Sequence, residues 1–182
     1  MTPRRPTPDC VVEPLAEHHA RAGFTCGVPE LDDYLRHRIG QDVRRGVTCA
    51  RVLVAAEGRC TVLGFYTLSS TIIPLKDLPP QVAGRLPRYP NIPATLLGRL
   101  AVRLTHRGRG LGEFLLMDAL AVSFRQSRIV ASLAVLVEAK DEAARAFYAR
   151  YGFNPFPTHP SRLFLPMKTI ERLILGAPTR LK

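Results

Sequence analysis

The sequence predicts one α/β domain in which a mixed central sheet is flanked by helices. Strand-like and helix-like segments follow in the order strand, helices, hairpin, strand, helix, strand, helix, strand. At the centre of this series stands a strand, a glycine-rich loop, a helix and a second strand. The 182 residues are enough for one full core and too few for two comfortable domains. We therefore expect a single domain over residues 1–182, with its core at about 10–175.

The N-terminal half contains the first strand, the first helices and a hairpin. Residues 10–15 are a short apolar strand candidate. Within 26–46 apolar residues recur at helical spacing, Pro29 suits the first helical turn, and acidic residues gather near the positive end of the helix. The apolar segments 48–56 and 60–75 are joined by the turn sequence EGR, and together they predict a β-hairpin.

The middle of the chain leads to the feature with the clearest chemistry. Residues 74–93 are rich in proline and are expected to be mostly loop. A strand over 94–102 leads into a tight basic loop and then into a helix from about Gly110 to Gln126, whose apolar side chains form one broad stripe.

The C-terminal part alternates again between strand and helix. A buried type of strand is expected within 128–139, and a helix over 141–152 that ends at Gly152, a residue preferred just past a helix C-terminus. The sequence RLFLPM predicts a further strand, and KTIERLIL predicts a last short amphipathic segment.

The charge of the chain departs from the average more than its apolar content does. Basic side chains number 26 against 15 acidic ones, which gives a net charge of +11 and a pI near 10.3, and 22 of the 26 are arginine. Arginine suits phosphate recognition, and a pI above about 9 is typical of nucleic-acid binding. A solvated surface enriched in arginine by codon usage explains the same numbers, so composition alone leaves both interpretations open.

Several classes of protein are disfavoured by the sequence. No stretch approaches the roughly 20 apolar residues of a membrane span, and the basic N-terminus has no apolar region behind it that would make a secretory signal. Cys10, Cys26, Cys49 and Cys60 are scattered, without metal-ligand spacing. We expect reduced thiols, no metal and a cytoplasmic protein.

The loop RGRGLG, residues 107–112, has the composition of a phosphate-binding site. A helix N-terminus presents unpaired N–H groups and a partial positive charge, glycines let a phosphate approach the backbone, and arginines add charge-assisted hydrogen bonds. The Walker pattern G-x-x-x-x-G-K-[ST] and the Rossmann pattern G-x-G-x-x-G are both absent. Taken alone, the loop indicates a phosphate-bearing ligand or simply a tightly packed helix start.

Two motifs together point to a family. Residues 107–112 match the R/Q-x-x-G-x-G/A acetyl-CoA signature of the GNAT N-acetyltransferases, and AFYARYGF, residues 146–153, resembles the tyrosine motif that follows it. The chain also resembles, over nearly its whole length, the GNAT toxins of bacterial toxin–antitoxin pairs, through FTCGVPELDDYLRHRIGQDVRRGVTCARVLVA, RYPNIPATLLGRLAVRLTHRGRGLG and RLFLPMKTI. Those enzymes acetylate the α-amino group of aminoacyl-tRNA and stop translation.

The resemblance implies a set of site residues. The cofactor is acetyl-CoA, and its pyrophosphate would be held by the backbone of the loop, with help from the Arg107 and Arg109 side chains. One amide of the strand before the loop would polarise the thioester carbonyl. Tyr148 matches the general acid that protonates the departing thiolate, whereas Tyr151 is assigned to packing. The implied cofactor-binding residues are Leu100, Ala101, Val102, Arg107, Gly108, Arg109, Gly110, Leu111 and Gly112.

The absence of one residue type bears on which acceptor the enzyme uses. The strand 94–102 contains no Asp or Glu that could act as a general base. A lysine amine with a pKa of about 10.4 is less than about a thousandth neutral at pH 7, whereas an α-amino group near about 8 is roughly a tenth neutral. A site without a strong base therefore suits an α-amine better, although a water chain or His106 would also serve as base.

Partners follow from charge and from the resemblance. Arg36, Arg44 and Arg45 could track an RNA backbone, and Arg99 is the leading candidate for contact with the acceptor end, with a buried structural ion pair as its alternative. The resemblance implies charged tRNA as acceptor, a ribbon-helix-helix antitoxin and a homodimer. The competing functions are a GNAT enzyme that acetylates a protein or a small amine, and a basic RNA- or CoA-binding module without catalysis.

Overall fold

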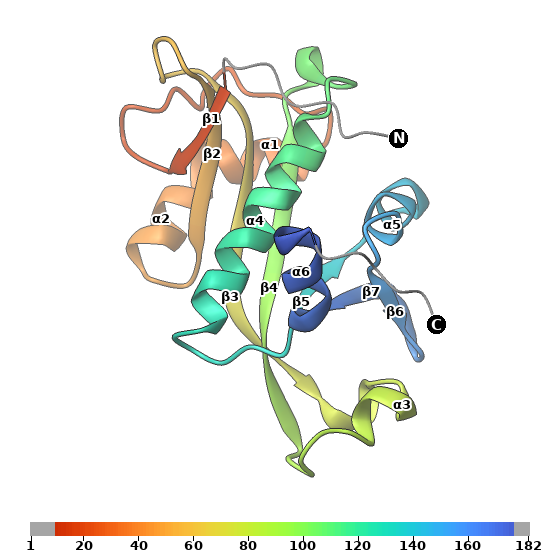
Figure 1. Cartoon of the computed structure of the whole chain (residues 1–182). Helices are drawn as coiled ribbons and strands as arrows, with labels where there is room; N and C mark the ends of the chain where they lie inside the picture. Colours follow the sequence, from red (N-terminus) through yellow and green to blue (C-terminus); the bar gives the residue numbers. More distant parts are fainter. Residues whose placement is uncertain (1–9, 177–182) are drawn as a thin grey trace. The chain divides into compact units, whose positions relative to one another are not determined.

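The computed structural model describes residues 10–176, which form one mixed seven-stranded sheet together with helices (Figure 1). The strand order is β1-β2-β3-β4-β5-β7-β6. The strands are β1 (Cys10–Pro14), β2 (Cys49–Ala55), β3 (Val62–Pro74), β4 (Asn91–Val102), β5 (Ala134–Glu138), β6 (Asn154–Phe156) and β7 (His159–Pro166). The helices are α1 (Pro29–Asp33), α2 (Ile39–Arg44), α3 (Pro80–Ala83), α4 (Leu111–Ser127), α5 (Glu142–Ala149) and α6 (Met167–Leu175). The predicted α/β class and mixed sheet are confirmed.

Strand pairing follows the predicted connections. The hairpin is confirmed, because β2 runs antiparallel to β3 with Ala50 opposite Thr67, and β1 adds antiparallel to β2. Strand β4 runs parallel to β5 over Thr95–Leu97, and α4 lies between them in the chain as the crossover that a parallel pair requires. Strand β7 is antiparallel to both β5 and β6.

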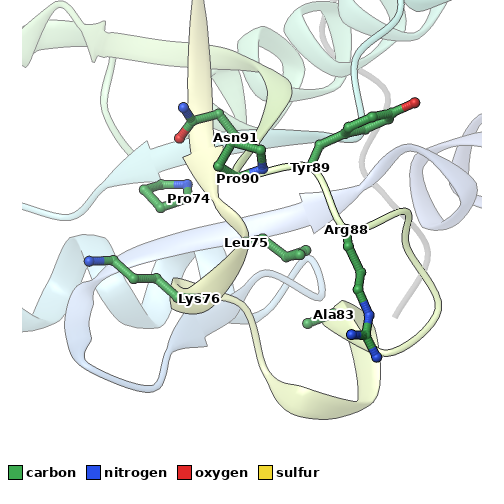
Figure 2. A pocket seen from close by; sticks show the side chains of 8 residues that line it. All are labelled: Pro74, Leu75, Lys76, Ala83, Arg88, Tyr89, Pro90 and Asn91. Carbon is green, nitrogen blue, oxygen red and sulfur yellow. The ribbon is translucent and has the colours of Figure 1, made fainter.

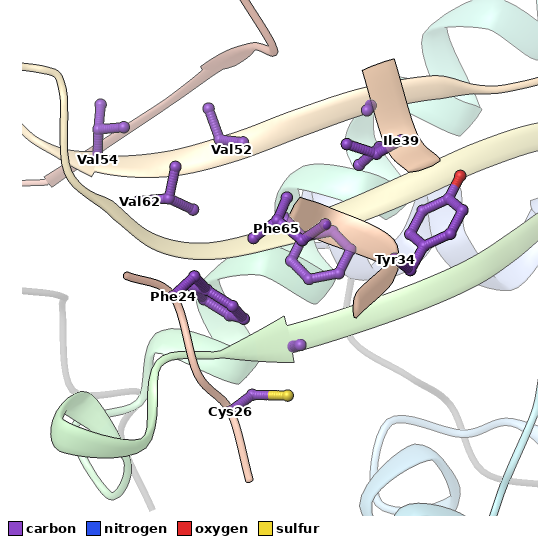
Figure 3. Packing of buried hydrophobic residues seen from close by; sticks show 11 residues of the cluster. Phe24, Cys26, Tyr34, Ile39, Val52, Val54, Val62 and Phe65 are labelled. Atoms are coloured by element: carbon purple, nitrogen blue, oxygen red, sulfur yellow. The ribbon is translucent and has the colours of Figure 1, made fainter. Parts of the chain in front are cut away.

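The chain groups into two compact units, each with its own core. Within the described residues, unit 1 comprises 10–69 and Arg99–Ala119, and unit 2 comprises Ser70–Gly98 and 120–176, so that β3, β4 and α4 each contribute to both. In unit 1 the aromatic rings of Phe24 and Phe65 meet edge to face at 5.7 Å within a buried cluster (Figure 3). In unit 2 Phe156 packs against Phe164 at 5.0 Å. The expectation of one domain over residues 1–182 remains a prediction, and its first nine and last six residues lie outside the described part.

Three local features differ from the expectation. The segment 74–93, expected to be mostly loop, holds a 3-10 turn over Leu75–Asp77 and the short α3, and β4 already begins at Asn91, so about half of it belongs to regular elements. Strand β6 was not predicted, since three residues carry too little periodicity to detect. The helix expected within 26–46 is interrupted by a π-helical turn, η1 (Tyr34–Arg38), in which the Ile39 amide donates to the Tyr34 carbonyl. Such turns are rare and occur often at functional sites.

Across residues 10–176, no helix is both long enough and apolar enough to cross a membrane.

Candidate active site

The loop between β4 and α4 has the open backbone that a pyrophosphate needs. Gly108 and Gly110 have φ angles of +75° and +78°, which favour glycine, and a Cβ atom on either would meet no atom within 4 Å. Helix α4 starts directly afterwards, and Phe114 donates its amide to the Gly110 carbonyl. The amides of the first turn that precede this bond point out of the helix end, as at any helix N-terminus. The backbone present here fits the phosphates of acetyl-CoA.

The same loop is tied to the segment that precedes α1. The Arg103 guanidinium donates to Gly23 O at 2.8 Å and to Val62 O at 2.9 Å, and the Leu104 amide donates to Thr25 O at 2.8 Å. The Arg107 guanidinium donates to the carbonyl of Cys26. This contact gives Arg107 an anchoring role that the sequence does not reveal, whereas Arg109 is exposed at the loop surface.

A buried carboxylate holds that anchoring segment in turn. Asp32 in α1 is 7% exposed, and its carboxylate accepts hydrogen bonds from the Cys26 amide at 2.7 Å and from the Thr25 hydroxyl at 2.8 Å. Burial acts to raise the pKa of Asp32, but these hydrogen bonds and the nearby Arg36 outweigh it and hold the pKa below its usual value. Asp32 therefore remains ionised and fixes the carbonyls to which the cofactor loop is bound.

The strand that enters the loop is packed tightly against β3 at one point. A Cβ atom on Gly64 would lie 2.9 Å from the Ala101 carbonyl oxygen and 2.7 Å from Leu115 Cδ1. Ala101 is buried and belongs to the core of unit 1, whereas its neighbours Leu100 and Val102 are only partly buried. Gly64 thus allows β3 to approach the stretch of β4 that the family resemblance assigns to the pantetheine arm.

Arg99 is stacked on an aromatic ring. Its guanidinium carbon lies 3.5 Å from the centroid of the Tyr34 ring, and the Tyr34 hydroxyl donates to Asp42 Oδ2 at 2.9 Å. Burial, followed by the hydrogen bond to Asp42, raises the pKa of Tyr34 to about 12, so the ring carries a neutral phenol. The alternative of a buried ion pair is not what the structure contains, because no ion pair found among residues 10–176 includes Arg99.

The other basic candidates fall into two kinds. Arg36 donates through Nε, at 3.0 Å, and through a second nitrogen to the Phe24 carbonyl, so its side chain stabilises the loop before α1. Arg44 and Arg45, at the end of α2, are exposed. His106 has a pKa lowered by burial and by the nearby Arg109 and Arg103, which makes it neutral at pH 7.

Tyr148 lies in unit 2 on α5. It is 8% exposed, and its ring contacts Phe147 and Phe153 at centroid distances of 5.2 and 5.4 Å. Asp141 caps the helix, because its carboxylate accepts the Ala144 amide at 2.8 Å, and this explains an acidic residue at that position. Burial raises the pKa of Tyr148 to about 12, which keeps its phenol protonated and able to donate a proton.

Two further features lie apart from these residues. Glu13, His18 and His19 place potential ligand atoms within 4.8 Å of one another. However, His19 Nδ1 accepts the Ala16 amide at 2.9 Å, so the ring proton sits on Nε2 and donates to Glu13, which also binds Arg59. The groups of this cluster are therefore already engaged in hydrogen bonds with one another and with the backbone.

In unit 2 a hollow of about 750 Å³ is lined by Pro74, Leu75, Lys76, Ala83, Arg88, Tyr89, Pro90 and Asn91, none of them a predicted site residue (Figure 2).

Comparison with known proteins agrees with this arrangement. Residues 48–155 match the acetyltransferase (GNAT) domain family. The chain belongs to the GNAT acetyltransferases. It is 40% identical over 152 residues to a tRNA-acetylating toxin of Mycobacterium tuberculosis (strain ATCC 25618 / H37Rv), a match that covers 83% of this chain and 88% of that protein.

Two solved structures are similar to this GNAT chain over most of its length. One is AtaT complexed with acetyl-methionyl-tRNAfMet, at 31% identity and a TM-score of 0.85, covering 91% of this chain and 99% of the other. The second is a tyrosine-to-phenylalanine mutant of AtaT bound to the C-terminus of the antitoxin AtaR and acetyl-CoA, at 29% identity and a TM-score of 0.78, covering 91% and 98%.

Replacing Gly64 by alanine is expected to disturb the strand beside the cofactor loop. The added methyl must displace the Ala101 backbone or Leu115, so we expect the free energy of unfolding to fall by about 1–3 kcal/mol and acetyl-CoA binding to weaken. Denaturant titration and calorimetry measure the two effects. Gly23→Ala is the matched control, because a Cβ there meets nothing within 4 Å. Equal behaviour of the two variants would show that the close approach of β3 and β4 is unimportant.

Proposed function

We propose that this enzyme transfers the acetyl group of acetyl-CoA to the α-amino group of an aminoacyl-tRNA and so acts as a toxin that blocks translation. The proposal is supported by its similarity to a tRNA-acetylating toxin and to AtaT in a complex with acetyl-methionyl-tRNAfMet. The observation in this chain that carries the choice of acceptor is strand β4. Its 12 residues include no carboxylate and include Arg99, stacked on Tyr34.

The cofactor would be held by the β4–α4 loop. The backbone of residues 107–112 offers its amides to the pyrophosphate, the exposed Arg109 adds charge, and Arg107 keeps the loop in place through Cys26. We assign the partly buried Leu100 and Val102, with Ala101 between them, to the pantetheine arm. Acetyl-CoA, when bound, supplies the acetyl group as a thioester.

Tyr148 is assigned as the general acid. In the net reaction the amine nitrogen gains an amide bond, the carbon–sulfur bond breaks, the amine loses one proton and the sulfur gains one. A buried phenol with its pKa raised to about 12 is fully protonated at neutral pH and delivers that proton from Oη. Tyr151 packs against Phe147 at 5.3 Å and against Arg150, which suits a structural role.

The amine itself needs little help from the protein. An α-amino group with a pKa near about 8 is roughly a tenth neutral at pH 7, whereas a lysine side chain is less than about a thousandth neutral and requires a strong base. Strand β4 supplies no carboxylate for that purpose. The same strand carries Arg99, and a cation near the acetyl group would favour an acceptor that carries phosphate and disfavour a small cationic amine.

We also propose the partners that the resemblance implies. These are charged tRNA, a ribbon-helix-helix antitoxin and a second copy of this chain, in a cytoplasmic protein. A toxin–antitoxin pairing is supported by the AtaT–AtaR complex. The apolar end of the chain is consistent with self-association, since Leu175 on α6 is 68% exposed.

Acetyl transfer tests the reaction and its acid together. Radiolabelled acetyl-CoA should label a pool of charged tRNA, and neither uncharged tRNA nor a lysine-rich protein. Tyr148→Phe should lower kcat by about 100-fold to 10,000-fold, the usual contribution of a general acid. Tyr151→Phe is the matched control and should retain activity. Label on the lysine-rich protein would instead favour a protein acetyltransferase, and an active Tyr148→Phe would remove the tyrosine from the mechanism.

The pH dependence gives a separate check on Tyr148. The phenol must be protonated to act, and its pKa of about 12 places the loss of that proton far above neutral pH. We therefore expect the single-turnover rate to rise as the α-amine loses its proton, up to about pH 8, and then to stay level, with no basic limb, up to about pH 10. Single-turnover rates on a hydrolysis-resistant aminoacyl-tRNA, with an amide at the 3′ end, allow this range to be reached. A limb near neutral pH that Tyr148→Phe abolishes would contradict the assignment.

Arg99 and its aromatic support are expected to act on the acceptor. Arg99→Gln should raise KM for charged tRNA and leave KM for acetyl-CoA unchanged, because we assign Arg99 to the acceptor and not to the cofactor. Tyr34→Leu should reproduce part of that effect, and Tyr34→Phe less, because phenylalanine keeps the ring under the guanidinium. Steady-state kinetics with each substrate varied in turn measure the split. A change confined to KM for acetyl-CoA would place Arg99 at the cofactor.

A further inference from the structure

Two guanidinium groups converge on a residue without a side chain. A Cβ atom placed on Gly40, in α2, would lie 3.3 Å from Arg21 Nη1 and 3.5 Å from Arg44 Nη1. Arg44 reaches this point because side chains on a helix tilt toward its N-terminus and cover the residue four positions earlier. Arg21 comes from the loop before α1, and its Nη1 donates to the Leu35 carbonyl at 3.4 Å. We call the space between these two side chains, over Gly40, the Gly40 notch.

No carboxylate neutralises the notch. Within the described part of the chain, neither Arg21 nor Arg44 takes part in an ion pair. The three aspartates of the same helical segment are engaged elsewhere. Asp32 binds the Cys26 amide, Asp33 pairs with Arg38 at 3.0 Å, and Asp42 accepts the Tyr34 hydroxyl. Two like charges close together repel each other, and an anion placed between them would relieve that repulsion.

We propose that the Gly40 notch binds one phosphodiester group of the tRNA backbone, shared between Arg21 and Arg44. A phosphodiester has two free oxygens, and planar guanidinium groups suit such oxygens as paired donors. The missing side chain at Gly40 lets both guanidinium groups lie close together over the helix, where one phosphate can accept from both. The chain has a net charge of +11, which favours a polyanionic partner. This inference rests on the proposed function for the identity of the RNA, and it adds Arg21, which sequence reasoning did not single out.

The notch is tied to the candidate acceptor site by the same short helical segment. Tyr34, which supports Arg99, begins the π-helical turn η1, and Gly40 follows at the start of α2. Both features lie within unit 1. A phosphate held at the notch would therefore fix the RNA relative to Arg99 and would contribute to binding without taking part in the chemistry.

The test is the salt dependence of binding to uncharged tRNA, which needs no acetyl transfer. Variants Arg21→Gln, Arg44→Gln, the double variant and Gly40→Glu would be compared with wild type by filter binding over a range of KCl concentrations. Losing one phosphate contact lowers the slope of log K against log salt by about one. Because one phosphate is shared, the double variant should lose about one in total, as should Gly40→Glu, whose carboxylate would occupy the notch. Arg38→Gln removes the same charge from the same segment and should leave the slope almost unchanged.

Several other outcomes would contradict a phosphate shared by Arg21 and Arg44. An unchanged slope in the double variant, or a loss of about two, would overturn the shared phosphate. Binding of polyglutamate lost in the double variant, with the tRNA slope intact, would overturn it in favour of a protein carboxylate. Unchanged affinity for acetyl-CoA and a Tm that does not fall are expected throughout and exclude misfolding. If charged tRNA is acetylated while the slopes do not change, only this inference fails; if acetylation fails while the slopes change, only the proposed reaction does.

Discussion

The structure of the candidate cofactor site depends on one set of hydrogen bonds, those that fasten the β4–α4 loop to the segment before α1. The Asp32 carboxylate accepts a hydrogen bond from the backbone of that segment. The segment's carbonyls accept hydrogen bonds from Arg103, the Leu104 amide and Arg107. A glycine-rich loop left free would have to be ordered by its ligand at an entropic cost. Because these hydrogen bonds hold the loop, its amides are in place before a phosphate binds. This lowers the entropic cost of ordering the loop on binding.

The charged side chains near α1 and α2 have two kinds of role. The three aspartates of α1 and α2, Asp32, Asp33 and Asp42, bind groups of the same part of the chain, which leaves several arginines there without a carboxylate partner. Some of these arginines hold the fold, as Arg36 does on the Phe24 carbonyl. Others, such as Arg99 on the Tyr34 ring and the two arginines near Gly40, take part in no ion pair within residues 10–176. A cationic surface arranged by the core is suited to a large polyanion, which has no need of a deep pocket.

Much of this could be predicted from the sequence, because the motifs are local. The hairpin, the β–α–β unit, the loop at residues 107–112 and the helix that bears Tyr148 each have their signal within a short window. The contacts that define the site have no such local signal, because they join residues far apart in the sequence. Arg107 and Cys26 are 81 residues apart, and Arg99 meets Tyr34 only after β4 and η1 have packed together. The π-helical turn was also missed, since its apolar spacing is that of an ordinary helix.

The most direct test of the central claim is the position of the acetyl group on the product. Charged tRNA would be incubated with the enzyme and acetyl-CoA, digested with nuclease, and the 3′-terminal aminoacyl-adenosine examined by mass spectrometry. The account predicts one acetyl group on the α-amino group of the attached amino acid, and none on uncharged tRNA. An acetyl group on a base or a ribose, or on protein lysine alone, would contradict it.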